Sequence, residues 1–206
     1  MKQTTVIISG HSHGLGAALA AAWLKHGARV LGLSRGNNPA LAAAYPGQLQ
    51  EIAIDLADPQ AVLDYSRSDA FRHTCQTAET LWLINNAGTV APSAPLGAQV
   101  DDDITHALNL NITAPLLLAN ATVAHARDRE RVRIVHISSG AARKPYPGWS
   151  IYGASKAALD RHAADAAAEG VRIVSLAPGV VDTAMQAGMR ADPAFPLRDQ
   201  FAALHA

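Results

Sequence analysis

The chain has 206 residues, a length typical of one domain built around one core. Lysine and arginine total 17, as do aspartate and glutamate, so the formal net charge is zero and neither nucleic acid nor an acidic membrane surface is expected as a partner. Cys75 is the one cysteine in the sequence, which excludes an internal disulfide and fits a reducing compartment. We expect a single domain over residues 1–206.

The N-terminal segment MKQTTVIISG carries one lysine and an apolar run that is too short for a signal peptide or a membrane-spanning helix. No later segment approaches about eighteen consecutive apolar residues. The sequence therefore predicts a cytoplasmic protein without a membrane partner.

Apolar, β-branched runs alternate along the chain with alanine-rich stretches of helical period. The runs expected to form strands are 4–9, 29–33, 49–54, 81–84, 132–137 and 171–176. The stretches expected to form helices are 15–25, 104–125 and 152–168. This alternation predicts βαβ units and a doubly wound α/β fold, in which helices cover both faces of a parallel sheet.

The segment SGHSHGLG at 9–16 follows the first expected strand and leads directly into a helix, which is the setting that a dinucleotide site needs. Gly10 permits the tight turn, Gly14 lets the backbone approach a pyrophosphate, and Gly16 allows close helix packing. Free N–H groups at the helix start then face the phosphates. The segment therefore predicts a dinucleotide cofactor.

Two features could also be interpreted as metal sites. His11 and His13 form a histidine pair, but a zinc site normally needs a third protein ligand, and none is identifiable from the sequence. The three aspartates at 101–103 fit the first turn of a long helix, where carboxylates offset the positive end of the helix dipole. We expect no metal, and we expect His13 to face the cofactor or solvent.

The residues that follow the second expected strand distinguish the two nicotinamide cofactors. An acidic residue about 20 positions beyond the glycine turn binds a ribose 2′-hydroxyl, whereas an arginine there pairs with a 2′-phosphate. The chain has Ser34 and Arg35 here, and no acidic residue before Glu51. A guanidinium matches phosphate oxygens in bidentate fashion, and a serine hydroxyl adds a donor. NADP is therefore favoured over NAD, with a solvated Arg35 as the alternative.

Tyr152 and Lys156, in the segment YGASK, lie four residues apart in an expected helix. Side chains at this spacing share one helix face, with Cβ atoms about 6 Å apart. By itself the pair fits either an ordinary helix surface or a site that uses a phenol beside an ammonium group.

Four further motifs complete a pattern with the glycine turn: NNAG at 85–88, ISS at 137–139, YGASK at 152–156 and PGVVDT at 178–183. In this order the chain resembles the short-chain dehydrogenase/reductase family over residues 4–183. The resemblance implies a Rossmann fold with about six strands in the order 3-2-1-4-5-6. Ser34-Arg35 and PGVVDTAMQ look most like the NADPH-dependent carbonyl reductases related to sepiapterin and benzil reductases.

The resemblance implies that Tyr152 is the general acid that protonates a carbonyl oxygen, and the base in the reverse direction. Lys156, together with the positive charge of the oxidised nicotinamide, is expected to lower the pKa of this phenol. Lys156 is also expected to hydrogen-bond the nicotinamide ribose. Ser139, thirteen residues before Tyr152, is expected to hold the substrate oxygen. Ser138 is the alternative, and consecutive strand residues face opposite ways, so one of the two serines can serve.

Asn111, within the long central helix, matches the asparagine that holds a water behind the lysine in this family. Asn109 is the alternative, and an asparagine followed by Pro115 could instead mark a kink. We expect Asn111 to complete the catalytic set.

The resemblance also implies which residues contact NADP(H). Asp55 would bond the adenine amino group, unless it acts as a cap in the turn before Asp58. The residues expected to contact the cofactor are Ser9, Gly10, Ser12, His13, Gly14, Leu15, Gly16, Ser34, Arg35, Asp55, Leu56, Asn86, Ala87, Gly88, Tyr152, Lys156, Pro178, Gly179, Val181 and Thr183.

The chain departs from the family at its C-terminal end, where members commonly continue with a final helix and a seventh parallel strand. We therefore expect a C-terminally shortened fold in which 171–176 is an apolar edge strand, covered by the tail or by another subunit in a homodimer. The residues that could form an apolar rim for an aromatic ketone are Pro145, Tyr146, Trp149, Ile151, Met185 and Met189.

The expected function is NADPH-dependent reduction of a small-molecule ketone or aldehyde to an alcohol. One alternative is an NAD-dependent alcohol dehydrogenase or an epimerase of the same superfamily. Another is a dinucleotide-binding protein with weak catalytic activity.

Overall fold

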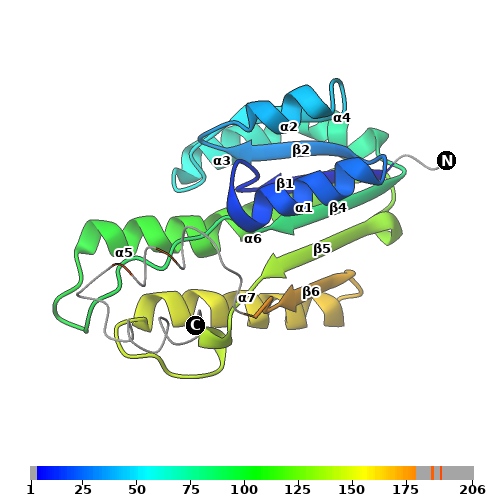
Figure 1. The fold of residues 1–206 in the computed structure, drawn as a ribbon. Coiled ribbons are helices and arrows are strands. Elements are labelled where there is room, and N and C mark those ends of the chain that lie inside the picture. The colour runs from blue at the N-terminus through cyan, green and yellow to red at the C-terminus, as the bar shows by residue number, and fades with distance from the viewer. Residues whose placement is uncertain (1–3, 180–186, 188–190, 192–206) are drawn as a thin grey trace.

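The computed structural model describes residues 4–179, 187 and 191 (Figure 1). The strands are β1 (Thr4–Ser9), β2 (Arg29–Ser34), β3 (Leu49–Ala53), β4 (Thr80–Asn85), β5 (Val132–Ile137) and β6 (Ile173–Leu176). They form one parallel sheet in the order β3-β2-β1-β4-β5-β6. The predicted α/β fold and its strand order are therefore confirmed, and five of the six strands agree with their predicted runs to within one residue at each end.

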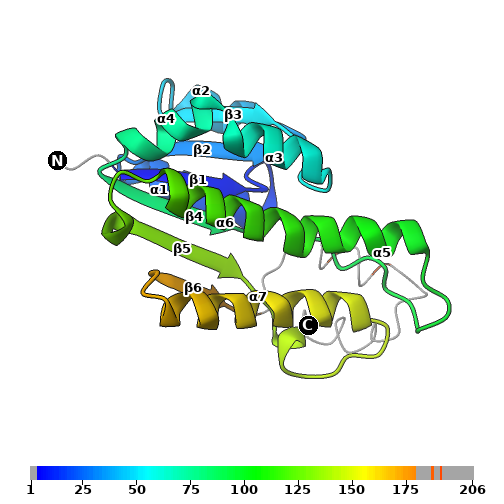
Figure 2. The same ribbon diagram turned by 180° about the vertical axis from the view of Figure 1, so that it is seen from behind.

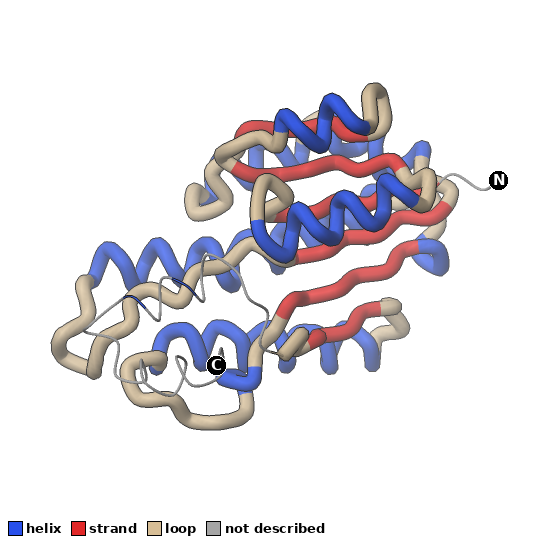
Figure 3. The backbone as a smooth tube through the Cα atoms, in the orientation of Figure 1, coloured by secondary structure: helices blue, strands red, loops and turns tan. Residues whose placement is uncertain are grey.

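The α-helices are α1 (Gly14–Lys25), α2 (Pro39–Ala44), α3 (Pro59–Arg67), α4 (Asp69–Thr77), α5 (Asp101–Leu108), α6 (Ala114–His125) and α7 (Ser150–Ala168). Short turns of other helix types are η1 (Asn109–Thr113), η2 (Arg129–Arg131) and η3 (Gly140–Ala142). Figure 2 shows α3, α4, α6 and α7 on one face of the sheet, and Figure 3 shows α1 and α2 on the other. The sheet is thus the middle layer of three.

The strands are apolar on both faces because each face packs against helices. Ile7 and Leu83 face the core that includes Leu118 of α6, whereas Val6 and Ile8 face the core formed with α1. This alternation follows from the two-residue period of a strand. A sheet buried on both sides is the normal setting of parallel strands.

The sequence analysis did not predict the three short helices α2, α3 and α4. Each begins at a capping residue, and each is short. Asn38, Asp58 and Ser68 each accept hydrogen bonds from backbone N–H groups in the first turn of the following helix. Such N-caps offset unpaired donors at a helix start. Helices of six to nine residues span too few turns for the apolar period to identify them.

The long helical run Asp101–His125 is apolar and long enough, by length and composition, to cross a membrane. Its second half, α6, instead packs on the sheet, with Pro115 and Leu118 buried there. The run is therefore a core helix of this fold.

Strand β6 is the last strand of the described sheet on the β5 side. It begins at Ile173, two residues later than predicted, and its Val174 and Leu176 are 56% and 52% exposed. The described residues thus place an apolar strand at this edge, as the sequence predicted.

Candidate active site

A pocket of about 940 Å³ lies at the carboxyl ends of the strands. In a doubly wound sheet this edge holds the ligand, at the point where the strand order reverses. Here the reversal falls between β1 and β4. Beyond the ends of β4 and β5, α5 and the first half of α7 extend past the sheet and flank the site (Figure 1).

The glycine-rich turn between β1 and α1 forms one wall of the pocket. Gly10 has a φ of 72°, which favours glycine, and an added Cβ on Gly16 would lie 2.0 Å from the Gly10 carbonyl oxygen. His13 is the N-cap of α1 but makes no side-chain cap hydrogen bond. The first N–H groups of the helix therefore stay available to phosphate oxygens, and the turn fits a dinucleotide.

Ser9 has a different role from the predicted cofactor contact. Its side chain is 2% exposed, and its hydroxyl accepts hydrogen bonds from the N–H groups of Asn86 and Ala87 at 2.9 and 3.0 Å. Ser9 does not line the pocket. It joins the end of β1 to the segment that follows β4, so it supports the cofactor wall from behind.

The segments that follow β2 and β3 form the next part of the wall. Ser34 is buried and Arg35 is exposed, and both line the pocket together with Ser12. Asp55 also lines it, while its carboxylate accepts a hydrogen bond from the Ala57 N–H at 2.9 Å. Both interpretations of Asp55, adenine contact and local turn residue, thus remain compatible with its position.

Asn111 and Lys156 meet across Gly88. A Cβ on Gly88 would lie 3.1 Å from Asn111 Oδ1 and 3.4 Å from Lys156 Nζ, so glycine permits this close approach. Asn111 is fully buried in the π-helical turn η1, where its amide pairs with the backbone of Thr89 and donates to Ser155 Oγ. A π-helical turn inside an α-helix is often found at a functional site.

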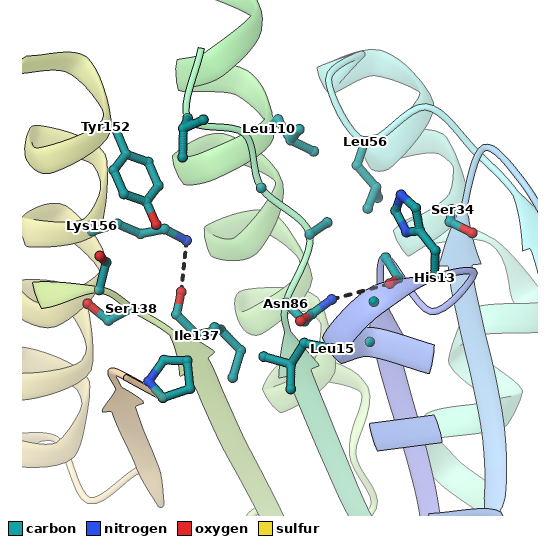
Figure 4. A pocket seen from close by; sticks show the side chains of 18 of the residues that line it. His13, Leu15, Ser34, Leu56, Asn86, Leu110, Ile137, Ser138, Tyr152 and Lys156 are labelled. Carbon is teal, nitrogen blue, oxygen red and sulfur yellow. Dashed lines mark hydrogen bonds between the residues drawn. The ribbon is translucent and has the colours of Figure 1, made fainter. Parts of the chain in front are cut away.

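Tyr152 projects from α7 into the pocket, and its polar end points to the same region as that of Lys156 (Figure 4). The Tyr152 side chain is 9% exposed, and burial raises the pKa of its phenol, while a hydrogen bond with Ser139 lowers it. Among the protein groups, desolvation of the phenolate outweighs the hydrogen bond. The lowered pKa expected from the sequence also includes the positive charge of the oxidised nicotinamide, so it stays a prediction.

Lys156 is 4% exposed, and its Nζ donates a hydrogen bond to the Ile137 carbonyl oxygen at 2.8 Å. Burial lowers the pKa of Lys156 to about 8, and the Asp160 carboxylate one helical turn further along offsets part of this fall. The ammonium group lies 5.7 Å from the centroid of the Tyr152 ring. The two members of the YGASK pair are therefore neighbours inside a pocket and not a helix-surface pair.

Of the two adjacent serines, Ser139 is the one whose side chain lowers the pKa of Tyr152. Its hydroxyl oxygen also accepts from the Ala141 N–H at 3.2 Å, which caps the short turn η3. Ser138 lines the pocket but is 3% exposed. Ser139 is thus the better placed to meet a substrate oxygen at the phenol.

An aromatic wall borders the Tyr152 end of the pocket. Trp149 lies between Tyr146 and Tyr152, with ring centroids 5.4 and 5.2 Å apart, and its indole N–H donates to Ser93 Oγ. Of the predicted rim, Tyr146 and Trp149 line the pocket, whereas Pro145 and Ile151 do not.

The pocket also includes residues that the sequence analysis did not identify. They are Gly36, Ile54, Val90, His106, Leu110, Ile137, Gly140 and Ala177. Most are apolar or small and belong to no motif, so only their position in the fold reveals them. Pro178 and Gly179 line the pocket, and Val181, Thr183, Met185 and Met189 lie outside the described residues.

The chain matches the short chain dehydrogenase family over residues 4–194. A benzil reductase ((S)-benzoin forming) of Bacillus cereus is 34% identical over 97% of this chain and 85% of its own length. A short-chain dehydrogenase/reductase structure from Burkholderia vietnamiensis has a TM-score of 0.84 at 42% identity and is matched over 94% of each chain. A metagenomic short-chain oxidoreductase, solved in complex with NADP, has a TM-score of 0.77 at 27% identity over 98% of this chain and 91% of that one.

These matches confirm the resemblance to reductases of the benzil and sepiapterin type. The six-stranded parallel sheet and its strand order agree with the fold of these neighbours. The chain belongs to the short-chain dehydrogenase/reductase family of oxidoreductases.

Proposed function

We propose that the protein is an NADPH-dependent reductase that converts the carbonyl group of a ketone or aldehyde to an alcohol. The observation that carries this proposal is one pocket that joins the uncapped start of α1 to the Tyr152 phenol, with Lys156 buried beside it. The first group suits a pyrophosphate, and the second suits proton transfer to an oxygen.

In the proposed reaction, NADPH held along the glycine-rich turn would supply a hydride to the carbonyl carbon. The Ser139 hydroxyl holds the carbonyl oxygen near the phenol, and Tyr152 donates its proton to that oxygen. A raised phenol pKa keeps this proton in place at neutral pH, so Tyr152 is ready to act as the acid. Lys156, charged below about pH 8, lies close enough to stabilise the phenolate that remains.

Asn111 supports this arrangement from behind. Its contacts with Thr89 and Ser155 fix it where its carbonyl oxygen comes close to Gly88, next to the ammonium of Lys156. An amide in this position can hold a water that returns a proton to the site. This water relay follows from the family resemblance and is part of the proposal.

The substrate we propose is an aromatic ketone or 1,2-diketone. The wall formed by Tyr146, Trp149 and Tyr152 offers flat apolar surface next to the reacting groups, and the relative from Bacillus cereus is named as a benzil reductase. The preference for NADPH is supported by Ser34 and Arg35 in the pocket wall and by the neighbour solved with NADP. A cytoplasmic location and a homodimer remain predictions.

An assay of NADPH and NADH oxidation against a panel of aldehydes, ketones and 1,2-diketones tests the proposal. Faster oxidation of NADPH with aromatic ketones or diketones is expected. A preference for NADH would favour the NAD-dependent alternative, and no turnover on any carbonyl would favour a binding protein with weak catalysis.

Replacing Arg35 by aspartate should narrow or reverse the preference for NADPH over NADH. The change removes a charge-assisted contact with the 2′-phosphate, worth roughly 1.5 to 3 kcal/mol, and adds repulsion. The ratio of kcat/KM for the two cofactors should therefore fall by about tenfold or more. Arg127→Asp is the control, because Arg127 is exposed in the segment before β5, at the opposite end of that strand from the pocket. An unchanged ratio for the Arg35 variant would contradict its assignment.

A further inference from the structure

A buried polar cluster lies beneath the glycine-rich turn. His11 is fully buried, although it belongs to the loop that faces the cofactor. Its Nε2 lies 2.8 Å from Oε1 of Glu51 on β3, and its Nδ1 lies 3.1 Å from Oγ of Ser34 at the end of β2. The imidazole thus connects the first three strands at the edge that carries the pocket.

The fold makes space for this ring. A Cβ on Gly32, inside β2, would lie 2.3 to 2.5 Å from three atoms of the His11 ring. Gly32 and Glu51 are partners in the β2–β3 register, so the Glu51 side chain begins next to the space that the His11 ring occupies. A glycine inside a strand often marks the close approach of another group, and here that group is the imidazole.

The hydrogen atoms available in this cluster limit which groups can donate to, and which accept from, the His11 ring. The Ser34 hydroxyl has one hydrogen, which it donates to the Gly36 carbonyl oxygen at 2.6 Å, so its oxygen accepts from His11 Nδ1. The Glu51 carboxylate is an acceptor, and the same oxygen also receives the Asn38 N–H at 2.6 Å. A Glu51 carboxylate can only accept, so beside it His11 donates from both nitrogens, and the pair as a whole carries no net charge.

This cluster adjoins the proposed site of the 2′-phosphate. Ser34, Arg35 and Gly36 line the pocket, and the Glu51 side chain directly behind them is 18% exposed. A carboxylate here would repel a phosphate if its charge were not offset, because both are negative. Arg35 is the cationic side chain of this wall, and the exposed His13 also lines it.

We propose that His11 is a positioning residue for recognition of the 2′-phosphate. It orients the Ser34 hydroxyl and the turn from Ser34 to Asn38, and it neutralises Glu51, so that the wall presents donors and net positive charge. This inference rests on the proposed use of NADPH. It also explains why a histidine in the loop, a glycine in β2 and a glutamate in β3 occur together.

The test compares two fragment ligands, 2′,5′-ADP and 5′-AMP, by isothermal titration calorimetry. His11→Leu should weaken 2′,5′-ADP binding by about tenfold or more and change 5′-AMP binding by no more than about twofold, because the lost contacts concern the phosphate. Adding Glu51→Gln to His11→Leu should recover several-fold of the loss, since it removes the repulsion. Glu51→Gln alone should stay within about threefold of wild type.

A control and a second variant make the result decisive. His73→Leu changes an exposed histidine on α4 and should bind both ligands as wild type does. If circular dichroism shows that His11→Leu does not fold, His11→Gln takes its place, since an amide keeps one donor without the charge, and a smaller loss of 2′,5′-ADP affinity is expected. Equal losses for both ligands, or no recovery with Glu51→Gln, would overturn the inference. If wild type binds 2′,5′-ADP no better than 5′-AMP, the proposed NADPH preference fails, and this inference with it.

Discussion

Replacing Tyr152 by phenylalanine should lower kcat for carbonyl reduction by about 10²-fold or more, because it removes the proposed proton donor. The ring itself should stay in place. It packs edge-on against Trp149, with centroids 5.2 Å apart, and phenylalanine keeps that contact. NADPH affinity should therefore remain close to that of wild type, and the loss should appear in kcat.

Steady-state kinetics with NADPH and a carbonyl that the wild type reduces, together with a binding titration of NADPH, measure these two effects. Tyr45→Phe is the matched control, because it removes a phenol hydroxyl from the end of α2, outside the pocket. If Tyr152→Phe retains most of its turnover, the assignment of Tyr152 as the acid is wrong.

Replacing Lys156 by methionine should also lower reduction by about 10²-fold or more, but with a gain in stability. Burial lowers the pKa of Lys156 to about 8, from 10.5, so the folded state disfavours the charged form. Methionine fills similar space without that cost. After loss of the hydrogen bond to Ile137 is allowed for, the free energy of unfolding at pH 7 should rise by about 1 to 2 kcal/mol.

The pH dependence of this gain has a defined sign. Because the folded pKa lies below the unfolded value, the unfolded chain binds more protons between about pH 8 and 10.5, and the wild type regains stability as pH rises through this window. The difference in Tm between Lys156→Met and wild type should therefore be largest below pH 8 and shrink above it.

Thermal unfolding of the cofactor-free proteins at pH 7 and at pH 10, with Lys25→Met as an exposed control, measures the effect. NADPH binding should weaken in Lys156→Met, unlike in Tyr152→Phe, because the proposed contact of Lys156 with the nicotinamide ribose is lost as well. A Lys156→Met protein that melts several degrees below wild type at pH 7 would contradict the description of Lys156 as a buried, poorly compensated charge.

Much of the fold could be predicted from the sequence because its strongest signals are local. The run at 4–9 is apolar, ends at a glycine turn and becomes β1 with the predicted bounds. The helix predicted over 152–168 differs from α7 (Ser150–Ala168) only at its start, by two residues. The position of Tyr152 and Lys156 on one face follows directly from helix geometry.

Features that depend on contacts between distant segments could not be predicted in this way. Ser9 reads as a cofactor residue in the motif, but its hydroxyl is used by the chain that follows β4, a contact that appears only when the strands are paired. The cluster of His11 with Ser34 and Glu51 likewise depends on the β2–β3 register. The π-helical turn at Asn111 adds one residue to a helix repeat, which the apolar period does not reveal.

The pKa of the Tyr152 phenol depends on burial as well as on neighbouring charge. A charge four residues away in the sequence suggests a lowered phenol pKa, but the result depends on how much water remains around the hydroxyl. In the folded chain, burial is the largest cause of the shift. Local spacing therefore identifies the partners of an acid without fixing its strength.

Transfer of deuterium from labelled cofactor tests whether this pocket carries out hydride transfer to a carbonyl carbon. Wild-type protein is incubated with NADPH that carries two deuterium atoms at C4 of the nicotinamide and with an aromatic 1,2-diketone, and the product is examined by mass spectrometry. One deuterium is expected on the carbinol carbon of the hydroxyketone for each NADPH oxidised. A product without deuterium at that carbon, or no product while the labelled cofactor stays unoxidised, would contradict hydride transfer to a carbonyl in this pocket.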